Sequence, residues 1–322
     1  MSDAGDISQI QTGTLDTIQK IVTVGADLPY YWFRGHSSSF GNLTPGIFRE
    51  DDGMSFYPER EINSVSQFRR QSPGYGTRLP QDGDFLGWLM FMQHYSLPTR
   101  LLDWIESVLV ASYFAVSERR YAKDDGEVWV MFPLALNTYS VGVGRFPSLD
   151  NPDLRYLAME PFANNPTAAM NEVGRIEFTP KAPLAFEPRF TIPRMVAQRS
   201  VFTIHPTHVR HRLIQLPISE APVAREHEPT IDITLALSKN NQHLCKYIIP
   251  SAAKPKLLSD LESLGFNENT LFVDWDSLSA AIKREITPGG TACIERTPPF
   301  LDLKPKDSEN SHPIPSQRSD EL

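Results

Sequence analysis

Charged side chains interrupt two apolar stretches of this chain. Arg34 ends the aromatic run YYWFRG at 30–35, and Arg100 and Asp103 lie inside TRLLDW at 99–104. Burying a charge costs free energy unless the charge is paired and hydrogen-bonded. These three residues therefore either form ion pairs inside the protein or bind a charged ligand.

Arg34 lies at the end of a predicted aromatic strand. A guanidinium in that position can bind a phosphate or a carboxamide with its planar fork of donors. The alternative is a structural ion pair with an acid such as Asp103 or Glu61. Both roles remain open at the level of sequence.

Arg100 and Asp103 are three positions apart in a predicted strand, so their side chains should point to opposite faces of the sheet. We therefore expect each to pair elsewhere, for example Arg34 with Asp103. One such buried network would hold a site rigid. Asp103 is then a supporting residue first and a ligand contact second.

Two further polar residues lie in apolar surroundings. His94 ends a predicted helix before Pro98, where it could either bind helix carbonyls or contact a substrate. Gln198 stands at the head of a predicted strand. Its amide could contact a ribose or a target molecule, or only satisfy backbone groups.

The sequence lacks the residues that several other kinds of functional site require. His205, His208 and His211 have no nearby Cys or carboxylate, which argues against zinc, and we expect no metal site. GVGRFP at 142–147 lacks the Lys-Ser/Thr of a phosphate loop. No Gly-x-Ser-x-Gly elbow of a serine hydrolase occurs.

The composition is that of an ordinary soluble protein. Of 322 residues, 40% are hydrophobic and 22% charged, and the net charge of −8 argues against binding nucleic acid through general basicity. Two cysteines make no disulfide framework. Because the N-terminus has no signal-like pattern and no apolar run is long enough for a membrane span, we expect a cytoplasmic protein that does not bind membranes.

Periodicity and turn residues predict short alternating elements. Helices are expected at 7–24, after Pro58, at 84–95 with Asp84 as N-cap, from Ser107, at 153–159 and near 192–198; strands at 30–34, 99–104, 126–134, 183–188 and 200–206.

A strand, a helix, a short strand and a helix follow from 246. We expect one α+β domain at 26–286 whose sheet is split by a cleft, a peripheral helical segment at 1–25, and a disordered tail at 287–322. Residues 206–232 are predicted to be an excursion.

Four stretches together resemble the FRG-domain family, named for its Phe-Arg-Gly signature. They are YWFRG at 31–35, QHYSLPTRLLDW at 93–104 with VASYFAV after it, PRMVAQRSVFTIHP at 193–206, and the segment 245–278. The tripeptide alone carries little information, but all four in this order are specific.

The order of these motifs also resembles the ADP-ribosyltransferase fold. In that fold one strand ends in an Arg that contacts NAD, a second carries a Ser/Thr signature and runs into a helix, and a third opens with Gln/Glu-x-Glu. Tyr31 to Gly35 resembles the first, Thr99 to Trp104 with VASYFA (110–115) the second, and Gln198 to Phe202 the third.

The resemblance implies NAD as substrate and assigns two groups of residues. The NAD-binding group is Arg34, Gly35, His94, Thr99 and Arg100, and the catalytic group is Arg34, Gln198 and Asp103.

One departure from the pattern affects catalysis. Ser200 occupies the position of the catalytic glutamate, and a serine supplies no anion to stabilise an oxocarbenium-like transition state. Either another acid replaces it, with Asp103, Glu61 and Glu187 as candidates, or the fold has lost NAD chemistry.

Two functions follow from the resemblance. The first is an NAD-dependent ADP-ribosyltransferase-like effector, a toxin or phage-defence protein that modifies nucleic acid or protein and has an antitoxin or defence-system partner. The second is a non-catalytic module that senses a nucleotide or a phage component on a degenerate version of the same fold. The missing glutamate favours the second, while the scaffold and Arg34 favour the first.

Overall fold

The computed structural model describes residues 10–41, 43–49, 58–75, 79–159, 182–189, 192–206, 233–237 and 243–273. The chain divides into two compact units, 1–273 and 274–322, and every described residue belongs to the first. The predicted tail at 287–322 and nearly all of the predicted excursion at 206–232 lie outside the described residues.

The described part of the chain contains one seven-stranded mixed sheet with the order β1-β7-β4-β2-β3-β6-β5. All neighbouring strands are antiparallel except β1 and β7, which are parallel. The strands are β1 (Gln11–Thr14), β2 (Trp32–His36), β3 (Leu101–Ile105), β4 (Gly126–Met131), β5 (Leu184–Phe186), β6 (Ser200–Ile204) and β7 (Leu244–Ile249).

The sheet is weakest between β2 and β3. These strands share one residue pair, Phe33 with Ile105, whereas the five residues of β2 from Trp32 to His36 all pair with β4. A four-stranded part (β1, β7, β4, β2) and a three-stranded part (β3, β6, β5) therefore meet at a single point. The α+β class predicted from sequence is confirmed, and the divergence of β2 from β3 opens space between the two parts.

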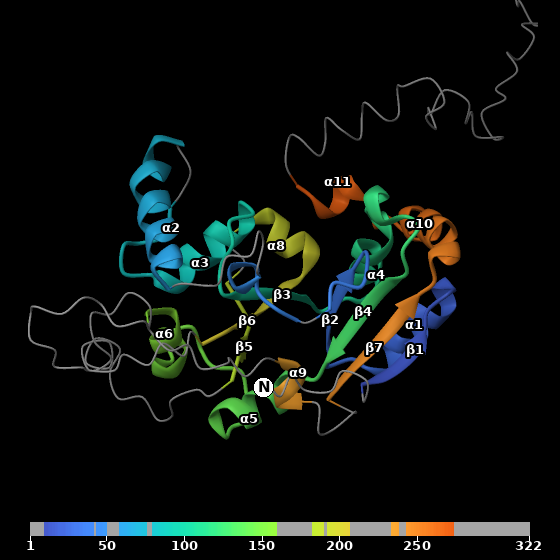
Figure 1. The fold of residues 1–322 in the computed structure, drawn as a ribbon, viewed down its shortest axis with the longest axis horizontal. Coiled ribbons are helices and arrows are strands. Elements are labelled where there is room, and N and C mark those ends of the chain that lie inside the picture. Colours follow the sequence, from blue (N-terminus) through green and yellow to red (C-terminus); the bar gives the residue numbers. More distant parts are fainter. Residues whose placement is uncertain are drawn as a thin grey trace, which may run out of the picture. The chain divides into compact units, whose positions relative to one another are not determined.

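Helices cover both faces of the sheet (Figure 1). They are α1 (Ile18–Asp27), α2 (Pro58–Gln71), α3 (Phe85–His94), α4 (Val108–Ser117), α5 (Pro133–Val141), α6 (Pro152–Met159), α8 (Pro193–Gln198), α9 (Ile233–Leu237), α10 (Lys254–Ser263) and α11 (Glu268–Leu271), with short 3-10 helices η2 (Gly46–Phe48), η3 (Ser72–Tyr75), η4 (Arg119–Tyr121) and η6 (Ser251–Ala253).

Three apolar clusters hold these layers together. The first packs α1, α4 and α10 on the four-stranded part, and the second joins the opposite face of the sheet to α5 and α9. The third packs α2, α3 and α6 on the three-stranded part. Since α3 and α4 belong to different clusters, each helix lies beside its own part of the sheet and the two flank the split.

Local sequence explains how the two helices nearest the split begin. Asp84 accepts a hydrogen bond from Gly87 N (2.8 Å) at the start of α3, as predicted. Ser107 accepts one from Val110 N (3.5 Å) at the start of α4. Both satisfy backbone donors that have no partner inside a helix. The predicted helices at 84–95 and 153–159 and the strand at 99–104 are confirmed in outline as α3, α6 and β3.

The N-terminal prediction is wrong in part. Residues 7–24 were expected to be helical, but Gln11–Thr14 form β1, and α1 begins only at Ile18 behind the N-cap Thr17. Parallel pairing with β7 overrides the helical spacing of the isoleucines. Leu15 (1% exposed) and Ile21 (0%) lie in the first apolar cluster, so this segment is part of the core rather than peripheral to it.

Among the residues that the structure describes, no helix has both the length and the apolar character to cross a membrane.

Candidate functional site

A pocket of about 550 Å³ lies where β2 and β3 diverge. It is lined by residues of β2, β3, β6, α3, α4 and α8. Among the polar residues identified in the sequence, Arg34, His94, Asp103 and Gln198 line it, and Arg100 does not.

Arg34 bridges the gap between the two parts of the sheet. Its Nη1 donates to the backbone carbonyl of Asp103 (2.7 Å), and its Nε donates to Nε2 of His36 (2.9 Å). The side chain thus replaces backbone hydrogen bonds that β2 and β3 do not make. Within the described residues its Nη2 makes no hydrogen bond, which leaves one face of the fork available to the pocket.

A row of largely buried polar side chains, which runs from His36 through Glu127 to Lys246, holds Arg34 in place. His36 accepts from Arg34, so its Nε2 carries no proton, and its Nδ1 faces Glu127 Oε2 at 3.8 Å. Glu127 accepts from Lys246 Nζ (2.8 Å) and Trp129 Nε1 (3.1 Å). This row crosses from β7 through β4 to β2, and it holds the guanidinium in one orientation.

Burial and neighbouring charges set the protonation states of Arg34, His36 and Glu127. Burial lowers the pKa of Arg34 to about 10, against the attraction of Asp103, and the guanidinium stays charged. Burial lowers the pKa of His36 to about 4, so the imidazole is neutral near pH 7. Burial raises the pKa of Glu127, but the interactions with His36, Lys246 and Ser39 outweigh it and bring the pKa to about 2.

Asp103 is held from the side of α3. Gln93 Nε2 donates to Asp103 Oδ2 (2.6 Å), and Thr99 Oγ1 donates to Gln93 Oε1 (2.6 Å). The expected contact between Arg34 and Asp103 exists, but it uses the backbone carbonyl of Asp103 and leaves its carboxylate to Gln93. Thr99 is fully buried, so it positions Gln93 and does not reach the pocket.

Arg100 is a structural residue. It is fully buried and forms an ion pair with Glu61 (2.6 Å), which is also fully buried. Its other donors bind the carbonyls of His205 (3.1 Å) and Ala158 (3.3 Å). Arg100 and Asp103 do face different partners, as their spacing predicted. The geometry gives no support to Arg100 as an NAD contact or to Glu61 as a partner of Arg34.

Gly35 also serves packing. A Cβ at this position would lie 1.9 Å from the backbone oxygen of Ala111, because α4 packs directly on β2. Only glycine permits this approach. The Gly of the Phe-Arg-Gly signature thereby seats α4 beside the pocket, although its backbone also lines the cavity.

Gln198 and His94 both line the pocket. Gln198 ends α8 rather than heading a strand, because Arg199 adopts a left-handed conformation (φ 51°) before β6 begins. Its Nε2 donates to Leu271 O (3.1 Å) and so ties α8 to α11. Arg194 stacks on Phe272 at 4.4 Å beside it.

The acids differ from those expected. Ser200, which the resemblance aligns with the glutamate of ADP-ribosyltransferases, is buried and lines the pocket. Glu61 forms the ion pair with Arg100, and Glu187 does not line this pocket. Asp103 and Glu118 are the two carboxylates among the described residues that do.

Sequence reasoning missed Glu118 and His36. Glu118 is exposed, and its Oε2 accepts from Ser37 Oγ (3.0 Å). It follows α4 with no local pattern that would mark it. His36 lies two residues after Arg34 on the same face of β2, and that spacing was a usable signal.

Comparison with protein families identifies part of this region. A family model described as FRG domain matches residues 29–124. The chain contains an FRG domain. The matched segment includes Arg34, Gly35, His94 and Asp103 but ends before Gln198. No curated protein and no solved structure matches the chain. The FRG domain therefore supplies β2, α3, β3 and α4 around the pocket.

Proposed function

We propose that the pocket of Arg34 binds NAD and that the protein transfers ADP-ribose from it. The observation that carries this proposal is the geometry of Arg34. A charged guanidinium is fixed at two donors by His36 and the Asp103 carbonyl, while Nη2 remains available at the pocket. Such a preorganised fork suits a pyrophosphate oxygen.

The size and charge of the pocket agree with a dinucleotide. Its volume of about 550 Å³ lies within the usual range of small-molecule sites. Arg49 and Arg194 also line it and add positive charge beside Arg34. Phe114 and Phe40 offer aromatic surface to a base or to the nicotinamide ring.

The reaction requires a carboxylate near the ribose. The bond from C1′ of the ribose to the nicotinamide nitrogen breaks, and nicotinamide leaves with the bonding electrons as a neutral molecule. The acceptor then bonds to C1′ and loses its proton to a base. Asp103 and Glu118 are carboxylates of this pocket, and each can stabilise the positive ribose or take the proton.

The two carboxylates suit different tasks. Asp103 is fixed by Gln93, as a group that stabilises charge should be. Glu118 is exposed and is bonded to Ser37 through Oε2, so it is accessible to an acceptor. Gln198 stays the candidate for the ribose, with one amide hydrogen committed to Leu271.

Calorimetric titration with NAD, followed by transfer of labelled ADP-ribose to cell lysate, tests the proposal. Wild type should bind and label. Asp103→Asn and Glu118→Gln should bind NAD but lose about 100-fold in rate, a typical cost of removing one charge-stabilising group. Arg119→Ala, exposed and outside this pocket, is the matched control. Wild type that neither binds NAD nor labels the lysate contradicts the proposal.

A second candidate is a nucleotide sensor without chemistry. It is favoured by Ser200, which supplies no anion, and by the hydrogen bond that already occupies the Asp103 carboxylate. Binding of NAD without any release of nicotinamide would select this candidate. Growth arrest on expression of wild type but not of Glu118→Gln would instead support a toxic or defensive effector, for which an antitoxin or defence-system partner stays a prediction.

A further inference from the structure

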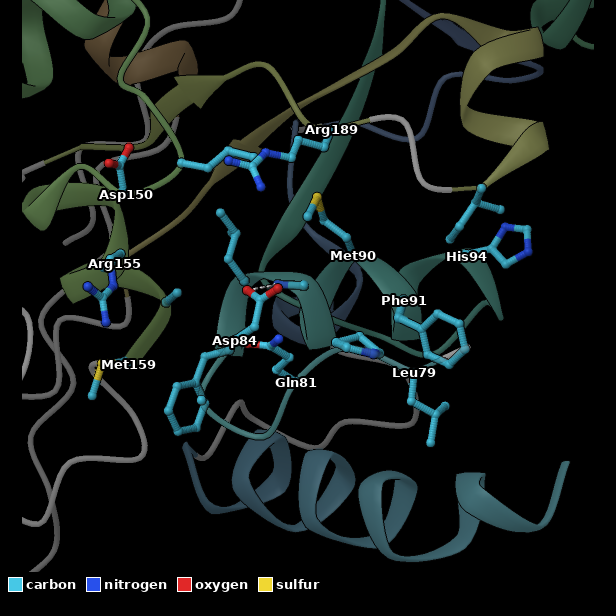
Figure 2. A pocket seen from close by; sticks show the side chains of 18 of the residues that line it. Leu79, Gln81, Asp84, Met90, Phe91, His94, Asp150, Arg155, Met159 and Arg189 are labelled. Atoms are coloured by element: carbon cyan, nitrogen blue, oxygen red, sulfur yellow. Dashed lines mark hydrogen bonds between the residues drawn. The ribbon is translucent and has the colours of Figure 1, made fainter. Parts of the chain in front are cut away.

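A second, larger pocket adjoins the first. Its volume is about 1080 Å³, and it shares Met90 and His94 with the pocket of Arg34. Figure 2 shows Met90, Phe91 and His94 of α3 on one side and Arg155 and Asp150 on the other. A ligand that filled both pockets would pass over Met90 and His94.

Two arginines line this second pocket from outside the FRG domain. Arg155 belongs to α6, and Arg189 follows β5. Both are exposed, and within the described residues neither guanidinium donates a hydrogen bond or joins an ion pair. Two cations without such partners beside one cavity are suited to anionic groups of a ligand.

Two acids, Asp84 and Asp150, line the same pocket and balance the formal charge of the two arginines. Asp84 is committed to the N-terminus of α3 through Gly87. Asp150 is exposed, and its pKa is lowered by a hydrogen bond from Ser148 and by the nearby charges of Arg189 and Arg155. An incoming anion would therefore compete with Asp150 for both arginines.

The floor of the pocket is apolar and partly aromatic. Phe85 is half-buried, and Tyr95 is 51% exposed. The Tyr95 ring lies at 5.1 Å from Phe91 and 4.8 Å from His94, so these neighbours hold it in place. An exposed ring that shares a pocket with two cations is an arrangement on which unpaired bases stack.

We propose that this second pocket binds the acceptor of the transfer and that the acceptor is a single-stranded nucleic acid. The inference rests on the proposed function, because the acceptor must lie next to the NAD pocket. Phosphates bind Arg155 and Arg189, and a base stacks on Tyr95. An acidic peptide would also satisfy the arginines, but it gives no reason for the ring. A nucleophile of the base or sugar bonds to C1′, nicotinamide leaves, and the proton of the nucleophile passes to Glu118.

Fluorescence anisotropy with labelled 12-mers of dT and rU tests the site without any need for NAD. Wild type should bind, and the affinity should fall as salt rises. Each phosphate contact contributes about 0.7 to the slope of log affinity against log salt. Arg155→Ala and Arg189→Ala should each lower that slope by about 0.7. Tyr95→Ala should weaken binding by about tenfold with the slope unchanged, since stacking carries no charge.

Asp150→Asn distinguishes nucleic acid from a cationic partner. The change frees both arginines, so oligonucleotide affinity should rise, whereas a basic peptide would bind more weakly. Arg119→Ala is the control, and thermal melts of every variant should match wild type because all the changed side chains are exposed. Absence of oligonucleotide binding, or binding unchanged in Arg155→Ala and Arg189→Ala, overturns the inference. A poly-Asp peptide that binds in place of the oligonucleotides overturns it as well.

NAD binding and oligonucleotide binding are measured separately, so a failure of the proposed function can be told apart from a failure of the acceptor assignment. NAD titration in parallel should give equal affinity for wild type and Arg189→Ala, because Arg189 does not line the first pocket. Binding of NAD without oligonucleotide refutes only the acceptor assignment. Binding of oligonucleotide without NAD refutes the proposed function, and with it the role of the bound oligonucleotide as an acceptor, although the nucleic-acid site itself is then supported.

Discussion

Arg34 donates from Nη1 to the backbone carbonyl of Asp103 at 2.7 Å, across the point where β2 and β3 stop pairing. One side chain therefore links the two parts of the sheet and also lines the pocket. Because Arg34 has both roles, a substitution there should lower both the stability of the protein and its affinity for NAD.

Arg34→Lys should lower stability and NAD affinity together. An ammonium cannot donate to His36 Nε2 and the Asp103 carbonyl in the geometry of the fork, and an unsatisfied buried acceptor costs about 1–3 kcal/mol. Loss of a charge-assisted hydrogen bond should weaken NAD binding at least about tenfold. Urea denaturation and calorimetry measure the two effects, with Arg119→Lys as control. Unchanged stability with lost binding would assign Arg34 to the ligand alone.

The Arg100–Glu61 pair should behave as a structural unit. Removing one partner, as in Glu61→Gln or Arg100→Met, leaves a buried charge or donor unpaired and should cost about 3–5 kcal/mol of unfolding free energy. The double variant Arg100→Met with Glu61→Leu should recover most of this loss. NAD affinity of the double variant should equal that of wild type. A double variant that folds but no longer binds NAD would restore Arg100 as a ligand contact.

Gly35→Ala should destabilise the protein severely. The new Cβ would lie 1.9 Å from the Ala111 carbonyl oxygen, so α4 must move away from β2. Such overpacking costs at least about 1–3 kcal/mol and changes the pocket between them. Gly74→Ala is the matched control, since nothing lies within 4 Å of its added Cβ. Comparable melting temperatures for the two variants would show that α4 can shift at little cost.

Stability should fall as pH drops below the ordinary histidine range. Burial lowers the pKa of His36 to about 4 and that of His205 to about 3, both from 6.5. Between these limits the unfolded chain binds protons that the folded chain does not, so the free energy of unfolding decreases with decreasing pH.

His36→Gln isolates one of the two groups. It keeps an acceptor for Arg34 but removes one titrating side chain, so the slope of unfolding free energy against pH should decrease by up to about 1.36 kcal/mol per pH unit. Denaturation between about pH 5 and 6.5 measures the slope, because the carboxylate of Glu127, with its pKa of about 2, does not titrate there. Equal slopes in wild type and variant would mean that His36 is protonated in the folded protein.

Local pattern determined much of this protein. Asp84 and Ser107 start α3 and α4 because a side-chain oxygen meets the free backbone donors of the first turn, and that interaction needs no tertiary partner. The alternation of short strands and helices similarly indicated an α+β domain. Period-two spacing placed Arg100 and Asp103 on different faces.

Tertiary structure decided which charges meet. Arg100 could have paired with any buried acid, and only the packing of α2 against α3, and of α3 against β3, brings Glu61, 39 positions earlier, to within 2.6 Å. Likewise the order of strands places β2 beside β3, and the split between them lets Arg34 reach a backbone carbonyl instead of a carboxylate. Sequence spacing cannot predict such choices, because electrostatic partners are selected by distance and burial in three dimensions. The position of Glu118 and the second pocket depend on the same long-range packing.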